Sequence, residues 1–430
     1  MATIEGSLRV ADRARHKIAW RIIPFVFVLY VISYLDRANV GFAKLSMTAE
    51  LGFSEAVFGF GAGIFFIGYL FLEIPGALIV ERWSARKWIA RILISWGICA
   101  TLTGFVRTPI HFYAARFLLG VAEAGFYPGI IVYLTHWFIG RDRARAMSGF
   151  IIGIPVSLMF GAPISSFFLR LHWFGLSGWR WVFILEGIPA VIFGIITLFY
   201  LTDHPREAGW LEPDEREWIT HELEEERQRK RAVGHASVWQ GLRQRNVLLL
   251  AVALCLTNVE SYAFVFWLPT TIRRASGLSI TSSTMWATLP FVVGLVSIVV
   301  SGHLSDLSGE RKFHAAVPLM LAATFFALST VPGQSFPIVL TWLCLTTAAG
   351  YAFPPPFWVL PTLTLGESAA AASIGLINLV GNLGGFIGPA AVGYVLTRTH
   401  SYPLGMLILA SGAMLGGLVL LGVRVQRQPG

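Results

Sequence analysis

Apolar residues fill this sequence in long unbroken runs, which short polar connections separate. The hydrocarbon core of a bilayer is crossed by a helix of roughly 20 apolar residues. Because the runs are continuous and do not alternate between apolar and polar positions, they predict spanning helices rather than the strands of a barrel. We predict twelve spans, at residues 19–43, 56–80, 88–106, 109–139, 144–169, 180–201, 247–272, 284–304, 314–331, 336–365, 372–398 and 403–424.

A long polar segment from Thr202 to Arg245 separates the first six spans from the last six. Pro213, followed by two acids, indicates a helix start, since proline suits the first turn and acids favour the helix N-terminus. We interpret the segment as a solvated linker helix; binding of calmodulin or nucleic acid is the alternative. The predicted all-α organisation is an N-terminal segment (1–18), a first half (19–201), a linker (202–246), a second half (247–424) and a tail (425–430).

The two halves repeat one another. The pattern of an acid, a small residue and a base at 77–87 recurs 225 residues later, at 302–312. The same offset of 225 residues makes Ser373 the counterpart of Ser148. Parallel repeats of this kind enclose a binding site near the membrane midplane. We expect the charged residues of the repeated loop to form a gating clasp, and anchoring by positive charge is the alternative reading. These residues are Glu81, Arg82, Arg86, Asp306 and Arg311.

Composition and charge support a membrane protein. The chain is 55% hydrophobic and 13% charged, well below the roughly 25% charged residues of soluble domains. Its net charge of +9 does not predict a nucleic-acid partner, because about 24 basic residues fall on the side of both termini and about 7 on the other. We therefore expect both termini in the cytosol, and an uncleaved first span after the basic N-terminus.

Charged residues also occur inside the predicted spans of the first half. Asp36 and Arg37 follow about 14 apolar residues, too few to cross the bilayer, and no helix stop comes after them. Arg116 and Glu123 are two helical turns apart and share a face. A charge at this depth costs roughly 2.5–3.5 kcal/mol on insertion scales, so it persists where it meets a cavity or a partner. There are two alternatives. These four charged residues could have a purely structural role, or Asp36 and Arg37 could lie at the membrane surface.

These residue types fit two tasks. A guanidinium can hold a carboxylate substrate through paired hydrogen bonds. A carboxylate in a medium of low dielectric constant can take up and release a proton. Other polar residues within spans are Tyr34, Tyr69, Asn258, Glu260, Asn378, Asn382 and, in a proline-broken run, Trp358. Asn382 could equally serve helix packing, whereas Glu73 and Glu186, near predicted span ends, are interpreted as structural.

No catalytic or metal-binding pattern is present in the sequence. It contains neither an HExxH motif nor a Walker loop, and its histidines are scattered. Cys99, Cys255 and Cys344 lie in three different apolar runs without metal-ligand spacing. We therefore expect no enzyme, no cofactor and no metal site.

Several motifs resemble the major facilitator superfamily and, more narrowly, its anion:cation symporter family. They are YLDRANVG (34–41), GYLFLEIP (68–75), RKWIAR (86–91), RFLLGVAEAGFYPG (116–129) and the segment 378–389. The run FWVLPT (357–362) is similar to the tartrate, phthalate and hydroxyphenylacetate permease branch. The likeness covers residues 18–424 and implies a twelve-helix transporter that moves organic anions with protons.

The resemblance also implies roles for single residues. Arg37 would bind the substrate carboxylate, Asp36 and Glu123 would be protonated, and Arg116 would pair with Glu123. The residues expected around Arg37 are Tyr34, Tyr69, Trp358, Asn378 and Asn258. The glutamines that sugar-acid members carry in spans five and seven are absent here, which favours a smaller or aromatic acid.

We accordingly predict a monomeric, proton-coupled symporter of a small organic acid anion in the cell inner membrane. An uncoupled facilitator or an anion exchanger of the same fold is the first alternative. A membrane-embedded enzyme or sensor is the remote one.

Overall fold

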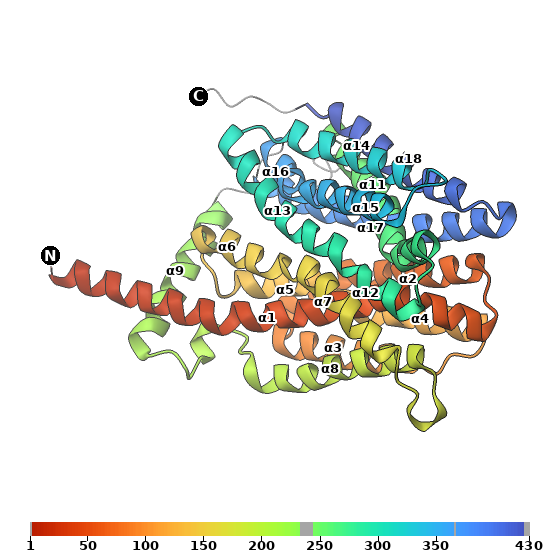
Figure 1. The fold of residues 1–430 in the computed structure, drawn as a ribbon. Coiled ribbons are helices and arrows are strands. Elements are labelled where there is room, and N and C mark those ends of the chain that lie inside the picture. Colours follow the sequence, from red (N-terminus) through yellow and green to blue (C-terminus); the bar gives the residue numbers. More distant parts are fainter. Residues whose placement is uncertain (1, 233–243, 365–366, 425–430) are drawn as a thin grey trace.

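The computed structural model describes the backbone of residues 2–232, 244–364 and 367–424. Among these residues the fold consists of helices and short turns, without strands, which confirms the predicted all-α class. The helices form two groups that lie side by side (Figure 1). The first group contains α1 (Ala2–Leu51), α2 (Glu55–Arg82), α3 (Ala85–Thr103), α4 (Pro109–Glu123), α5 (Phe126–Thr135), α6 (Gly140–Ile151), α7 (Gly153–Phe168) and α8 (Gly178–Tyr200).

The second group follows the linker helix α9 (Pro213–Ala232) and is coloured green to blue in Figure 1. It contains α11 (Arg245–Ser276), α12 (Ile280–Trp286), α13 (Thr288–Ser308), α14 (Lys312–Ser329), α15 (Phe336–Ala352), α16 (Pro354–Thr364), α17 (Glu367–Thr399) and α18 (Tyr402–Leu421). We call the end of the bundle that carries α9 and the start of α1 the linker end, and the opposite end the far end.

Eleven helices or joined helix pairs of the described chain are long and apolar enough to cross a membrane. The twelfth predicted span corresponds to α3, which has three basic residues in its first turns: Arg86, Lys87 and Arg91. These charges lower its hydropathy, yet α3 packs along α8 and α4 within the first group. Counted with α3, the structure has the twelve spans that the apolar runs predict.

Four of the predicted spans are divided into two helices. Span five divides at Ile152, between α6 and α7, and span eight at Ala287, between α12 and α13. Span four was expected to be continuous over 109–139, but it divides into α4 and α5 at Ala124 and Gly125. Gly125 has a φ of +83°, and a Cβ there would lie 3.0 Å from Gly76 Cα, so a larger residue would be strained and crowded. The break in span ten, between α15 and α16, falls at the predicted proline run.

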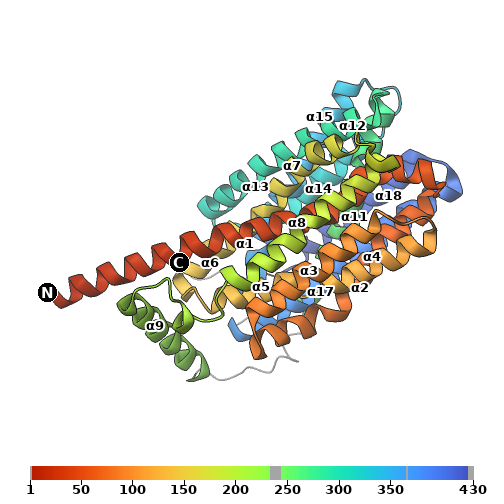
Figure 2. The same cartoon turned by 90° about the horizontal axis from the view of Figure 1, so that it is seen from below.

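The linker helix begins at Pro213, as predicted, and lies beside the start of α1 (Figure 2). Ion pairs hold it to the first group of helices. Lys17 Nζ lies 2.9 Å from Glu215 Oε2, and Arg143 Nη2 lies 3.0 Å from Glu226 Oε1. This part of the linker is therefore docked on the first group rather than surrounded by solvent on all sides.

Polar contacts join the two groups at the far end. The indole nitrogen of Trp267, on α11, donates a hydrogen bond of 3.0 Å to Glu55 Oε2 at the start of α2. Buried Lys44 pairs with the same carboxylate oxygen at 2.9 Å and also donates to Thr270 Oγ1 at 3.3 Å. Because α1 and α2 belong to one group and α11 to the other, these bonds hold the far end together.

Close helix packing leads to a stability prediction. A Cβ at Gly120 of α4 would lie 2.0 Å from the Phe65 carbonyl oxygen of α2. We expect Gly120→Ala to lower the free energy of unfolding by roughly 1–3 kcal/mol, because one helix must shift. Gly375→Ala on α17 is the matched control, since its Cβ would meet no heavy atom within 4 Å. Thermal unfolding in detergent tests the pair, and equal losses in both variants would contradict the packing argument.

Candidate functional site

A cavity of about 250 Å³ lies between the two groups of helices, and described residues from both groups line it. Its lining is mainly apolar and aromatic, with a few polar side chains, which is the usual make-up of a small-molecule site. All six residues predicted to bind substrate line this cavity: Tyr34, Arg37, Tyr69, Asn258, Trp358 and Asn378. Their part in binding remains a prediction.

Arg37 reaches this cavity because α1 continues through Asp36 and Arg37 to Leu51, as the absence of a stop signal predicts. Neighbouring residues of a helix point about 100° apart, so the two charges face different surroundings. Arg37 lines the cavity, whereas Asp36 faces α3, where it accepts a hydrogen bond of 2.5 Å from Trp96 Nε1. Both side chains are buried, with 1% of Asp36 and 9% of Arg37 exposed.

Arg37 is held at the cavity wall by an acid and by aromatic rings. Its Nε donates to Glu123 Oε1 at 2.7 Å, and Ser33 Oγ donates to the same oxygen at 2.8 Å. The guanidinium carbon lies 4.8 Å from the ring centre of Tyr69 and 5.3 Å from that of Tyr34, close enough for cation–π attraction. In this state the charge of Arg37 is therefore compensated within the protein.

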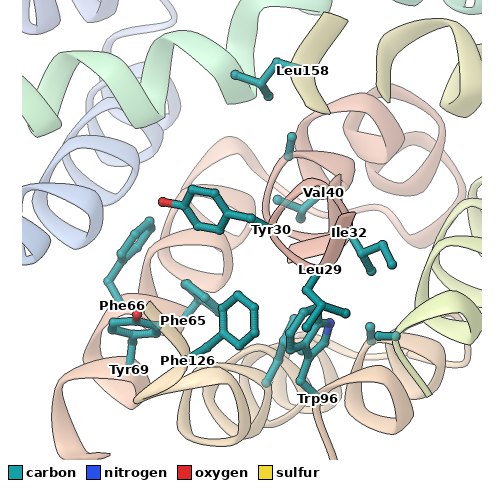
Figure 3. Packing of buried hydrophobic residues seen from close by; sticks show 14 of the residues in the cluster. Leu29, Tyr30, Ile32, Val40, Phe65, Phe66, Tyr69, Trp96, Phe126 and Leu158 are labelled. Carbon is teal, nitrogen blue, oxygen red and sulfur yellow. The ribbon is translucent and has the colours of Figure 1, made fainter. Parts of the chain in front are cut away.

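Aromatic side chains pack beside α1 in two sets, one around Phe65 and one around Trp96 (Figure 3). The Phe65 ring lies 5.1 Å from Phe66 and 6.0 Å from Tyr69, and the Trp96 ring lies 5.4 Å from Phe126. These rings fill the space between α1, α2, α3 and α5 and fix the direction of the Trp96 indole. The two sets therefore support both charged residues of α1.

Arg116 does not make the expected pair with Glu123. It is fully buried over the Phe65 ring, and its three side-chain nitrogens have no hydrogen-bond partner. Seven residues of helix rise by about 10.5 Å, so sharing a face does not bring Arg116 level with Glu123. Arg37 approaches Glu123 from the facing helix and forms the pair instead.

Other buried polar atoms near this ion pair also lack a hydrogen-bond partner. Glu123 Oε2, Asn39 Oδ1 and Glu186 Oε2 are buried without a hydrogen-bond partner. Glu186 on α8 accepts a hydrogen bond of 2.6 Å from Ser165 Oγ. It also lies close enough to Asp36 for the two carboxylates to interact electrostatically. Buried polar groups are normally satisfied, so this cluster indicates ordered water or partners that arrive in another state. From the sequence we interpreted Glu186 as structural, because it lies near a predicted span end, and so did not predict its place in this network.

The asparagines of the second group contact protein atoms in this state. Asn378 and Asn382, predicted to share a face of α17, both donate to Glu73 of α2, which joins the two groups. Asn258 donates to the Gly381 carbonyl at 2.9 Å and so links α11 to α17. Glu73, interpreted as structural from its position, thus bridges the halves beside the cavity.

Residues 26–389 match the family model of the Major Facilitator Superfamily. The chain belongs to this superfamily. It is 42% identical to an Agrobacterium vitis protein named "Putative tartrate transporter", over 95% of this chain and 94% of that one. It is 34% identical to the quinolone resistance transporter of Acinetobacter baumannii, over 94% of this chain and 93% of that one.

The fold is shared with solved transporters of low sequence identity. The D-xylose-proton symporter superposes with a TM-score of 0.74 at 14% identity, covering 93% of this chain and 97% of that one. The superfamily and these relatives confirm that the protein is a multi-pass membrane transporter and not an enzyme.

The contacts of the repeated loops are described in part for this Major Facilitator Superfamily member. The side chains of Glu81 and Arg82 lie outside the described residues. The backbone amide of Arg86 donates to Asp203 Oδ1 at 2.8 Å, which caps the start of α3. In the second repeat, Arg311 Nη1 pairs at 2.7 Å with Oδ1 of Asp306, which lies in the last turn of α13. A gating role for these residues remains a prediction.

Proposed function

We propose that this transporter carries a small organic acid anion together with protons by alternating access. The observation that supports this most directly is the ion pair between Arg37 and Glu123 at the wall of the central cavity. A guanidinium there suits a carboxylate substrate, and its present partner is an acid that can be neutralised by one proton.

The charges of the first half suggest how the two events are coupled. Asp36 and Glu123 balance Arg37 and Arg116, so these four side chains carry no net charge when all are ionised. A proton on Glu123 would remove the partner of Arg37 and leave one positive charge at the cavity wall. An anionic substrate would restore neutrality, so proton and anion would favour each other's binding.

Alternating access would require the two groups of helices to rock against one another. The contacts of Lys44 and Trp267 with Glu55 would keep the far end closed in the present state. Basic residues favour a cytosolic location for the linker end and both termini, and hence an outer location for the far end. We further propose that the protein acts as a monomer in the bacterial inner membrane, with tartrate-like or aromatic acids as candidate substrates, since one relative is named for tartrate.

Uptake into proteoliposomes tests the coupling. With the outside one pH unit more acidic, we expect a transported acid to accumulate up to about tenfold per coupled proton, because such a gradient is worth about 1.4 kcal/mol per proton. A protonophore should abolish the accumulation. Uptake that stops at equal concentrations with the pH gradient intact would identify an uncoupled facilitator or an exchanger and reject the symport mechanism.

A further inference from the structure

The cavity contains an acid that the proposed coupling does not use. Among the described residues that line it, formal charge is present at two positions, Arg37 in the first group and Glu260 on α11 in the second. Only 4% of Glu260 is exposed. Among the described residues its carboxylate accepts one hydrogen bond, from Ser261 Oγ at 3.4 Å, which is at the outer limit for such a bond, and no described cation pairs with it.

The other buried acids near the site have firmer partners. Glu123 is paired with Arg37, Asp36 accepts from an indole and an amide, and Glu73 accepts from two amides. Burying a carboxylate without a partner is costly, so buried charges in proteins are normally paired. Glu260 faces a cavity that is wide enough for a ligand, and a ligand can therefore supply the missing partner.

The surroundings of Glu260 indicate what kind of partner this is. The second group contributes six aromatic side chains to the same cavity: Tyr262, Phe264, Phe291, Tyr351, Phe353 and Trp358. Aromatic faces attract cations, and a carboxylate forms strong hydrogen bonds with a charged N–H donor. A cavity lined by both an acid and aromatic rings is thus suited to a protonated nitrogen.

We propose that Glu260 binds a protonated nitrogen of the substrate, so that the transported acid is amphoteric. Its single carboxylate would bind Arg37, and its ammonium or protonated heterocycle would bind Glu260. This inference rests on the proposed function, because it takes Arg37 as the carboxylate site. It narrows the candidate substrates to small molecules that carry one negative and one positive charge, and it therefore excludes the tartrate-like dicarboxylates named among the candidates above.

Charge balance separates such a substrate from a dicarboxylate. With Glu123 protonated, the cavity lining carries one positive and one negative charge, which a zwitterion matches. The second carboxylate of a dianion would meet Glu260 and no described cation of the lining. Like charges at close range oppose binding. The cavity, at about 250 Å³, is smaller than the roughly 300–1,000 Å³ of drug-sized sites, so the substrate is a small molecule.

Two probe series of similar shape test the proposal by binding, without a pH gradient. One is 4-(aminomethyl)benzoate, 4-ethylbenzoate and terephthalate; the other is 4-aminobutyrate, pentanoate and glutarate. Each series places a cation, a neutral group or an anion opposite one carboxylate. Binding is measured on the purified protein by ligand-induced thermal stabilisation and by competition in counterflow.

We expect the wild-type protein to bind the cationic member of at least one series about tenfold or more tighter than the other two, as loss of a charge-assisted contact predicts. Glu260→Gln should remove this preference and admit the dicarboxylate. Glu260→Asp should keep the preference, which shows that the charge is responsible and that the fold is intact.

Three other results would overturn the proposal. Neutral or dianionic acids that bind best to the wild type, in a manner that depends on Arg37, would reject the role of Glu260 while leaving the carboxylate site in place. Unchanged discrimination in Glu260→Gln, together with loss of pH-driven accumulation for every acid, would make Glu260 a proton carrier. Absence of binding by all six acids would reject this inference together with the proposed organic-acid function.

Discussion

Replacing Arg37 by lysine is expected to weaken substrate binding by roughly thirtyfold or more, equivalent to about 2 kcal/mol. Lysine keeps the positive charge and so leaves Glu123 with a partner. It loses the planar fork that holds a carboxylate by two parallel hydrogen bonds, and its compact charge stacks less well on Tyr34 and Tyr69. Apparent affinity in counterflow, without a pH gradient, measures the effect.

Alanine at this position would be a poorer test. It would leave the Glu123 carboxylate buried without its ion-pair partner, a change that typically costs 3–5 kcal/mol of stability. Arg227→Lys on the exposed face of α9 is the matched control, because its guanidinium lies far from the cavity lining. Wild-type affinity in Arg37→Lys, at an unchanged melting temperature, would show that the carboxylate binds elsewhere.

Replacing Glu123 by glutamine is expected to abolish accumulation driven by a pH gradient while exchange of substrate continues. Glutamine has the shape of the protonated acid but cannot release a proton, and it leaves Arg37 free of its anionic partner. Substrate should therefore still bind and cross in counterflow, and its affinity should no longer weaken as the pH is raised. In uptake, the ratio of inner to outer concentration should stay at one with the gradient imposed.

Glu217→Gln, an exposed acid of α9, is the control for the removal of a carboxylate. It should accumulate substrate like the wild-type protein. If Glu123→Gln also accumulated substrate against its gradient, the coupling proton would have to be carried by another acid. Asp36, Glu73 and Glu186 are the other buried acids described in the same half.

The charged network of the first half is better explained by function than by stability. Buried ion pairs are a poor source of stability, because loss of hydration offsets their attraction. Here Arg116 has three nitrogens without hydrogen bonds, and Glu123 and Glu186 each have one such oxygen. A network built for stability would satisfy these groups, whereas one that changes partners during a transport cycle cannot satisfy all of them in every state.

The sequence alone determined the parts of this protein that depend on one helix at a time. Span number follows from the length and apolarity of each run, since the bilayer sets both. The depth of Asp36 and Arg37 follows from the apolar residues before them and the missing stop after them. The motifs and polar residues of the two halves likewise identified a transporter and six side chains that share one cavity.

Tertiary structure alone decided which of these groups meet. It paired Glu123 with Arg37 rather than Arg116, broke span four at Gly125, and joined Glu73 to two asparagines of the other half. It also brought Glu260 of the second group and Arg37 of the first group to the lining of one aromatic cavity. The reason is that side-chain pairing depends on the rotation and relative height of neighbouring helices. The rotation and height of each helix are determined by close contacts between distant segments, such as that of Gly120 with Phe65. A local pattern of polar and apolar residues does not encode these contacts.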